Sequence, residues 1–177
     1  MSAVLTNTAC GASVIGAPTL VVVDLQEWIA SSPLIGDTVT KAGSLVEHAR
    51  AEEWPIVFLK INSIHKPHNP VAASLLRAVD GYTRCTERAK DGMGGGEEVA
   101  DACAIEGYPT ERFVICGVWL KGCILQTVRQ LSALYPAATI DVVVDACNFE
   151  ASEWRSAFEE MPSVHLTTLD QLQVTLK

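Results

Sequence analysis

Cys123 is the residue of this sequence best suited to nucleophilic chemistry. It follows the segment Gly117–Gly122, which turns the chain from a β-branched run into a helical pattern, so we expect it at or near a helix N-terminus. The helix dipole and the free backbone N–H groups at such a position lower the pKa of a thiol. The same N–H groups stabilise an oxyanion, as acyl transfer requires. The alternative is a buried, small, apolar residue, which is the usual fate of a free cysteine.

Asp24 and Lys90 are the charged residues that would complete such a site. A carboxylate beside a thiol takes its proton and later returns that proton to a leaving amine. A nearby ammonium stabilises the thiolate and keeps the carboxylate ionised. Considered singly, Asp24 is more simply the cap of a helix or turn, and Lys90 an ordinary surface lysine. Their combination with Cys123 is what points to catalysis.

The three residues are predicted to meet because each of them lies at or just beyond the end of a strand. Short runs rich in β-branched residues occur at 19–23, 56–61, 112–118, 139–144 and 164–167, and a further short strand is expected near 88–90. Continuous apolar runs are typical of strands buried on both faces of a parallel sheet. Ligands bind outside the carboxyl ends of such strands, where Asp24, Asn62, Lys90 and the turn after Gly117 stand. Asp145, after the run 139–144, is expected to be a structural cap.

Helical patterns lie between these runs and define the fold class. Apolar residues recur at helical spacing over 42–49, 99–105 and 124–135, and Ser152 is a candidate N-cap for a helix that reaches Met161. Strands that alternate with helices predict right-handed crossovers with helices on both faces. We expect an α/β fold, Rossmann-like, with one three-layer α/β/α domain over residues 18–177 and a six-stranded, mostly parallel sheet. Residues 1–17 are expected to be an extension that is flexible or crosses to a neighbouring subunit.

The composition excludes several classes of partner. The 177 residues include 13 basic and 21 acidic residues, which gives a net charge of −8 and a pI near 4.9. Nucleic acids and anionic membranes need a basic face, so neither is an expected partner. No stretch approaches the roughly 20 apolar residues of a membrane span, and the N-terminus lacks the pattern of a signal peptide. The six scattered cysteines of a chain this long favour reduced thiols and a cytoplasmic location.

The order and spacing of these motifs resemble the isochorismatase-like hydrolases, also called the cysteine hydrolase superfamily. That family includes nicotinamidases, N-carbamoylsarcosine amidase and isochorismatases. The matching segments are Val21-Val-Val-Asp24-Leu-Gln26, then Lys90, then Val114-Ile-Cys-Gly117-Val-Trp-Leu-Lys-Gly-Cys123, so that the resemblance covers about residues 18–148. It implies that Asp24, Lys90 and Cys123 form a catalytic triad.

The resemblance also implies the structure of the turn before the nucleophile. A cis peptide would join Val118 to Trp119, and the oxyanion donors would be backbone N–H groups between Trp119 and Cys123, with Gly122 in the same turn. This chain departs from the family at Leu120 and Lys121, where Thr and then Asp or Asn are usual. It also departs at Met93-Gly-Gly-Gly96, where a Ser-Ala-Phe segment is common.

These departures leave the wall of the substrate pocket to other residues, among them aromatic side chains from this chain or from a neighbouring subunit. The candidates for the pocket are Gln26, Trp28, Asn62, Trp119 and Leu120.

No metal or other cofactor is expected. Nicotinamidase-like members carry an Asp-x-His pair after the second strand, together with a further His, and these residues hold a divalent ion. The corresponding stretch here places Asn62 at the aspartate, with His65 and His68 beyond it. Two histidines without a carboxylate make a weak site, because bound divalent ions gather three or more protein ligands. The run Gly92–Gly96 is a weak candidate for a phosphate loop, since Glu97 follows directly, and a flexible turn is the simpler interpretation.

We therefore expect a small-molecule hydrolase, most simply one that cleaves a C–N amide bond through a cysteine thioester. One alternative is an isochorismatase-type reaction, in which an aspartate protonates a vinyl ether without a cysteine. The other is a non-catalytic scaffold or binding protein with the same fold. Apolar composition and the resemblance both predict a homo-oligomer, as a dimer, tetramer or octamer.

Overall fold

Six parallel strands form the centre of the molecule. The computed structural model describes residues 16–62, 69–148 and 156–175. The strands are β1 (Thr19–Val23), β2 (Ile56–Ile61), β3 (Cys85–Lys90), β4 (Arg112–Gly117), β5 (Thr139–Cys147) and β6 (Val164–Thr167). They pair in the order β3-β2-β1-β4-β5-β6, and every pair of neighbours is parallel. The predicted six-stranded sheet is confirmed, and its named strands are all parallel rather than mostly so.

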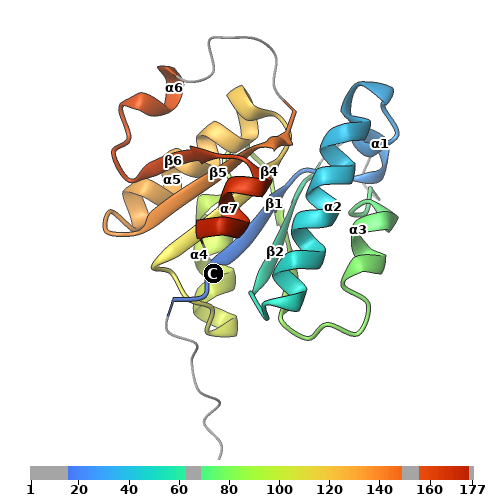
Figure 1. Ribbon diagram of the computed structural model, residues 1–177, viewed down its shortest axis with the longest axis horizontal. Coiled ribbons are helices and arrows are strands. Elements are labelled where there is room, and N and C mark those ends of the chain that lie inside the picture. The colour runs from blue at the N-terminus through green and yellow to red at the C-terminus, as the bar shows by residue number, and fades with distance from the viewer. Residues whose placement is uncertain (1–15, 63–68, 149–155, 176–177) are drawn as a thin grey trace, which may run out of the picture.

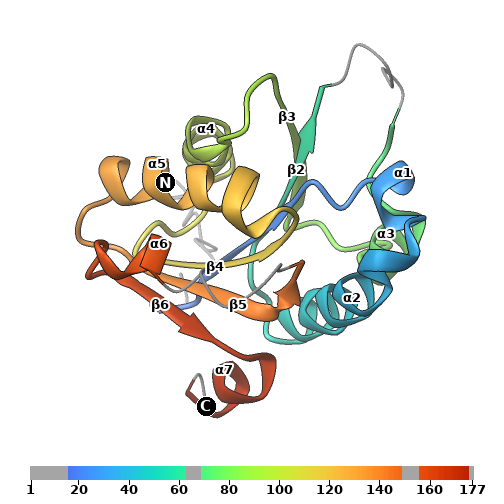
Figure 2. The same ribbon diagram turned by 90° about the horizontal axis from the view of Figure 1, so that it is seen from above.

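Helices cover both faces of this sheet. They are α1 (Glu27–Ala30), α2 (Gly36–Ala51), α3 (Ala73–Ala78), α4 (Gly96–Glu106), α5 (Leu125–Leu134), α6 (Ser156–Glu159) and α7 (Leu169–Thr175), with a 3₁₀ turn η1 (Pro33–Ile35) and a π turn η2 (Leu120–Ile124). Figure 1 shows the sheet behind α2, and Figure 2 shows α4 and α5 on one face with α2 and α3 on the other. The three-layer α/β/α architecture is therefore confirmed.

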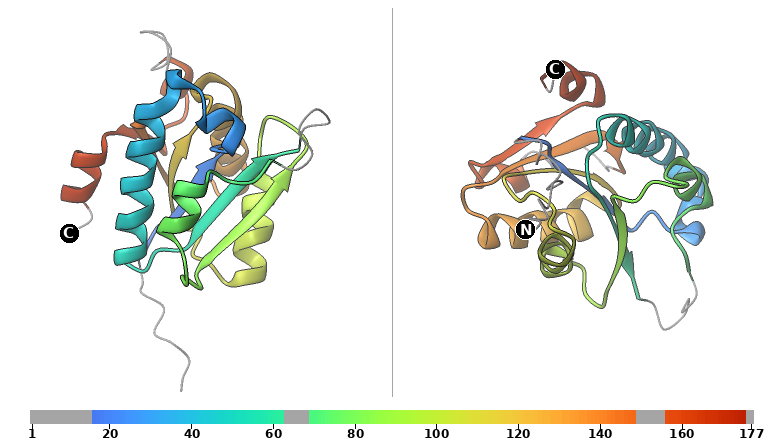
Figure 3. Two further views of the ribbon diagram at one scale, coloured as in Figure 1. Left: turned by 90° about the vertical axis from the view of Figure 1, so that its right-hand side faces the viewer. Right: turned by 90° about the horizontal axis from the view of Figure 1, so that it is seen from below.

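The buried face of each helix follows from its apolar spacing. In α2, Ala42, Leu45, Val46 and Ala49 are all fully buried, as their helical recurrence predicts. The edge-on view in Figure 3 shows α2 and α7 on one side of the sheet and α4 on the other. None of the helices in the described part of the chain is long and apolar enough to cross a bilayer.

Two expectations about these elements need correction. The fourth long run does not end at Val144, because β5 continues to Cys147 and so contains Asp145. The Asp145 side chain accepts a hydrogen bond from the Leu169 N–H at the start of α7, at 2.9 Å, so it anchors a distant helix instead of capping its own strand. Ile105 does not belong to the buried face of α4, since its side chain is 72% exposed. Ser152 lies outside the described residues.

The order of the strands determines where a site can form. The chain runs outward from β1 in both directions along the sheet, so β1 and β4 are the neighbours at which the order reverses. Ligands of open parallel sheets bind at the carboxyl ends of the strands on either side of such a point. Five described cysteines are free, as expected for reduced thiols, and Cys10 lies outside the described residues.

Candidate active site

Asp24 lies directly after β1, at the carboxyl end of the central strand. Its backbone N–H donates to the Leu59 carbonyl of β2 at 3.0 Å, and its carbonyl accepts the Gln26 N–H at 2.9 Å. The φ angle of Asp24 is 54°, a left-handed value that is uncommon for residues other than glycine. The side chain is nevertheless 1% exposed. Strained backbone of this kind persists where the surrounding structure holds it, and it clusters at functional sites.

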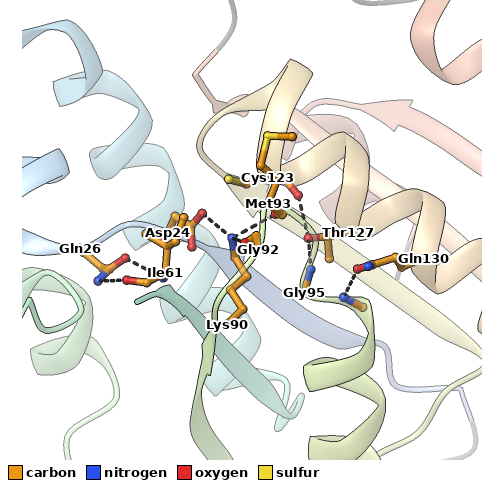
Figure 4. Close-up of polar contacts among 11 residues, drawn as sticks. Asp24, Gln26, Ile61, Lys90, Gly92, Met93, Gly95, Cys123, Thr127 and Gln130 are labelled. Atoms are coloured by element: carbon orange, nitrogen blue, oxygen red, sulfur yellow. Dashed lines mark hydrogen bonds and ion pairs between the residues drawn. The ribbon is translucent and has the colours of Figure 1, made fainter. Parts of the chain in front are cut away.

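Lys90 is the last residue of β3, and its side chain reaches across the width of β2 to Asp24 (Figure 4). The Nζ atom lies 2.9 Å from Asp24 Oδ2 and donates to the Gly92 and Met93 carbonyls, both at 3.0 Å. An ammonium has three protons to donate, so every one of them has an acceptor. The side chain is fully buried. The position of the positive charge is therefore set by one carboxylate and two peptide dipoles.

One oxygen of the Asp24 carboxylate forms an ion pair, and the other has no hydrogen-bond partner among the described residues. Oδ2 pairs with Lys90, whereas Oδ1 is buried and has no hydrogen-bond partner among the described residues. Burial raises the pKa of Asp24 above its ordinary value, and the Lys90 charge opposes that rise. A buried polar atom without a partner is uncommon in native proteins and is costly to retain. Oδ1 is therefore the atom at which this carboxylate can accept a proton.

Cys123 lies in η2, two residues before α5 begins, close to the helix N-terminus that its sequence context predicts. Its side chain is 7% exposed. The thiol interacts with both the Asp24 carboxylate and the Lys90 ammonium. Burial is the largest cause that raises the pKa of the thiol, to about 11, and the negative charge of Asp24 is the second. The positive charge of Lys90 acts in the opposite direction. The expectation of a lowered thiol pKa is wrong for the free protein, because loss of solvation outweighs the nearby positive charge.

The turn between β4 and η2 lies against the end of β1. A Cβ at Gly117, whose φ angle is 124°, would stand 2.1 Å from the Val23 carbonyl oxygen, so only glycine fits. The Val118 N–H donates to that same carbonyl at 2.9 Å. The following peptide, between Val118 and Trp119, is cis, as the resemblance implied. This turn brings the start of η2 directly beside Asp24.

Some of the N–H groups expected to stabilise an oxyanion already have acceptors. The Leu120 N–H donates to Asn148 at 3.3 Å, and the Gly122 N–H donates to Trp119 at 2.9 Å. Within the described residues, no carbonyl or side chain accepts the N–H of Trp119. This backbone group therefore remains available at the turn.

The pocket candidates divide by exposure and by partners. The buried side-chain amide of Gln26 is hydrogen-bonded to backbone groups. Its Nε2 donates to the Asn69 carbonyl at 2.8 Å, and its Oε1 accepts the Ile61 N–H at 2.9 Å. Gln26 thus holds the β1–α1 connection to β2 and does not present its amide to a ligand. Asn62 is exposed and donates to Asp91 at 2.8 Å.

The remaining pocket candidates differ in how much of the side chain is accessible. Leu120 is buried at 2% exposure, while Trp28 and Trp119 are 47% and 44% exposed. The two tryptophans are therefore the candidates with accessible apolar surface.

Two candidate metal ligands, His65 and His68, lie outside the described residues. Among the residues that the structure does describe, no group of three or more His, Cys, Asp or Glu side chains is arranged to hold a metal ion.

Two residues that the sequence did not single out also belong to this region. Thr127 and Gln130 of α5 bond the backbone of the segment 91–96, which we call the glycine segment. The segment is packed against α5, which the interpretation as a flexible turn did not anticipate. A sequence signal for Thr127 exists, since it stands four residues after Cys123 and therefore on the same helical face.

Comparison with known proteins places this chain in a family. The family described as isochorismatase domain matches residues 18–171. The N-carbamoylsarcosine amidase of Thermoplasma acidophilum is 18% identical, with a TM-score of 0.69 over 86% of this chain and 96% of that one. An octameric hydrolase of unknown specificity, the YcaC gene product of Escherichia coli, is 21% identical, with a TM-score of 0.69 over 90% and 78%.

A nicotinamidase of Staphylococcus aureus is 16% identical, with a TM-score of 0.67 over 85% of this chain and 97% of that one. No curated protein matches the sequence. Identities this low show the shared fold alone, but the family match extends over most of the chain and includes Asp24, Lys90 and Cys123. The protein belongs to the isochorismatase family and has its hydrolase fold.

Proposed function

We propose that this protein hydrolyses the C–N bond of a small amide through a thioester on Cys123, with Asp24 as the proton carrier. The observation that carries the proposal is the convergence of three elements on one buried site. The carboxylate keeps a spare oxygen there, and the ammonium is fully bonded. The thiol, the base and the cation that amide cleavage needs come from the ends of β1 and β3 and from η2.

The first half of the reaction forms the thioester. Asp24 takes the thiol proton of Cys123 as the sulfur attacks the carbonyl carbon of the amide, and the carbonyl oxygen becomes an oxyanion. The Trp119 N–H, which has no acceptor among the described residues, is the donor that we assign to that oxyanion, and such donors lower the barrier most when they are already oriented. Asp24 then returns the proton to the amine or ammonia as the C–N bond breaks.

The second half restores the enzyme. A water molecule replaces the amine, Asp24 takes one of its protons, and the resulting hydroxide attacks the thioester carbonyl. The C–S bond breaks, a carboxylic acid is released, and Cys123 recovers its proton from Asp24. Lys90 stays charged throughout and stabilises each anionic state. The raised pKa of Asp24 suits this exchange, because a more basic carboxylate takes up the thiol proton more readily.

The test is release of ammonia or amine from a panel of small amides, with Cys123→Ala as the diagnostic variant. The matched control is Cys103→Ala, because burial raises the pKa of the Cys103 thiol to the same value of about 11 at a position in α4. We expect Cys123→Ala to lose turnover by about a thousandfold or more, and Cys103→Ala to keep it.

Either of two other results would contradict the proposal and favour a different function. Turnover of a vinyl ether that survives Cys123→Ala would indicate the isochorismatase-type reaction, which needs a proton from Asp24 but no nucleophile. Absence of any turnover, together with binding of the same small molecules, would indicate a binding protein with this fold.

We also propose that the protein is a homo-oligomer. Large apolar side chains are exposed on several elements, among them Leu34 at 83% and Val174 at 77%. A structural neighbour with the same fold is an octameric hydrolase, and exposed apolar side chains are commonly buried where subunits meet. Light scattering at micromolar concentration should return a mass well above the 19.0 kDa of one chain, and a monomeric mass would contradict the proposal.

A further inference from the structure

We propose that Thr127 is a positioning residue, which sets the distance between the Cys123 thiol and the Lys90 ammonium by joining α5 to the glycine segment. The inference rests on the proposed function, because it assigns a role to the spacing of two groups in that site. Thr127 touches neither the thiol nor the ammonium directly. It acts through the backbone on either side of them.

The hydroxyl of Thr127 is bonded on both sides. Its Oγ1 donates to the Cys123 carbonyl at 2.7 Å and accepts the Gly95 N–H at 3.0 Å (Figure 4). The side chain is fully buried. A threonine hydroxyl has a single proton to donate, so its orientation is determined by these two partners. One side chain thus connects the backbone of the nucleophile with the backbone that follows Lys90.

The glycine segment carries this connection on to the ammonium. The Gly92 and Met93 carbonyls, three and two residues before Gly95, each lie 3.0 Å from Lys90 Nζ. A second tie runs parallel to the first, because the Gly96 N–H donates to Gln130 Oε1 at 2.8 Å. The two α5 residues involved are three apart and so share a helical face.

Close packing leaves this segment little freedom to adjust. A Cβ at Gly95 would stand 2.5 Å from Leu59 and 2.9 Å from the Lys90 side chain, and a Cβ at Gly96 would stand 2.4 Å from Gln130. Side chains are therefore excluded at the two glycines that Thr127 and Gln130 hold. The segment fits against α5 and Lys90 at once, which couples their positions.

The spacing matters because the electrostatic interaction in a buried site depends strongly on distance. Lys90 is the group that opposes the rise in the Cys123 pKa, so a looser Lys90 would stabilise the thiolate less. Valine has the shape of threonine without its hydroxyl, so Thr127→Val removes both bonds with little change in packing. Thr127→Ser retains both bonds.

The experiment measures how fast iodoacetamide alkylates Cys123 as pH rises, with mass mapping of the modified residue. The matched control is Thr40→Val, since Thr40 also donates to the carbonyl four residues before it, at 3.0 Å, on the exposed face of α2. We expect Thr127→Val to alkylate about tenfold more slowly at neutral pH, with its profile displaced upward by about one pH unit. Thr127→Ser should recover most of the wild-type rate, and Thr40→Val should match it.

The possible outcomes separate this inference from the function it rests on. Equal alkylation rates and pH profiles in Thr127→Val and the wild type would overturn the positioning role, while leaving the Cys123 reaction intact. Absence of amide turnover in the wild type itself would instead contradict the proposed function. A shift in thermal stability without a shift in the pH profile would show a structural role only, and so overturn the inference. If Thr127→Val does not fold, Gln130→Met tests the same coupling by removing the hydrogen bond between Gln130 and the Gly96 N–H. We expect the pH profile of alkylation to shift upward in this variant too, by less than one pH unit.

Discussion

The carboxylate that follows the central strand β1 and the carboxylates within β5 have different hydrogen-bond partners. Asp141 in β5 pairs with Arg112 at 2.6 Å, and Asp145 accepts from Lys41 at 2.6 Å and from the Leu169 N–H at 2.9 Å. Both oxygens of Asp145 thus have partners. Asp24 has only one bonded oxygen, although it is more deeply buried than Asp145.

The contrast teaches where chemistry is possible in this sheet. In the outer half, around β5 and β6, carboxylates join α2, α7 and β4 to β5, and their hydrogen-bonding capacity is used in doing so. At the junction of β1 and β4, one oxygen of the Asp24 carboxylate and the Trp119 N–H have no partner among the described residues. Satisfied groups stabilise the fold, whereas unsatisfied groups retained at a cost are available to a substrate.

Neutralising one carboxylate in each half gives the largest expected difference. Asp24→Asn removes the proton acceptor, so we expect turnover of an amide that the wild type cleaves to fall by about a thousandfold. Asp145→Asn keeps an oxygen that accepts the Leu169 N–H, so turnover should stay close to that of the wild type. Steady-state kinetics on the same amide measures both. Near-equal turnover in the two variants would remove the distinction between the halves.

Replacing one lysine in each half should show that the buried ion pair contributes more to the unfolding free energy than the exposed one. Lys90→Met leaves a buried carboxylate without its partner, which costs about 3–5 kcal/mol of unfolding free energy. Lys41→Met breaks an exposed pair, where salt and water already screen the charges, so we expect little change. Urea denaturation of both variants is the measurement. A Lys90→Met protein as stable as the wild type would show that Asp24 takes up a proton to compensate.

The smallest expected effect compares the thiol of the site with one outside it. Burial raises the pKa of Cys123 and of Cys103 from 9.0 to about 11, so the folded state holds each thiol proton more tightly than the unfolded state. The resulting stability is fully present below pH 9 and is lost as pH rises through 11. Replacing either cysteine by alanine should therefore reduce the fall in unfolding free energy over that range by about 2 kcal/mol.

This last comparison also tests the state of the nucleophile. Unfolding free energies of Cys123→Ala, Cys103→Ala and the wild type are measured from pH 8 to about pH 11. Suppose that the fall in unfolding free energy at alkaline pH is the same in Cys123→Ala as in the wild type, but smaller in Cys103→Ala. The Cys123 thiol would then ionise at lower pH in the folded protein than its raised pKa implies.

Much of the fold and the three central residues of the site could be predicted from the sequence, for a local reason. A strand buried on both faces needs a continuous apolar run, and the residue that ends the run stands at the edge of the sheet. Asp24 after Val23, Lys90 at the end of its strand and the turn after Gly117 are visible in that way. The resemblance of the same motifs to a known family added the cis peptide between Val118 and Trp119.

Only the tertiary structure decided how those residues are bonded and how strongly they hold protons. Burial of Cys123, the spare oxygen of Asp24 and the extension of β5 past Asp145 depend on what packs there from distant parts of the chain. Thr127 gains its role in the same way, because its hydroxyl meets Gly95, 32 residues earlier in the sequence. Backbone periodicity is a property of neighbouring residues, whereas solvation and hydrogen-bond partners are properties of the folded whole.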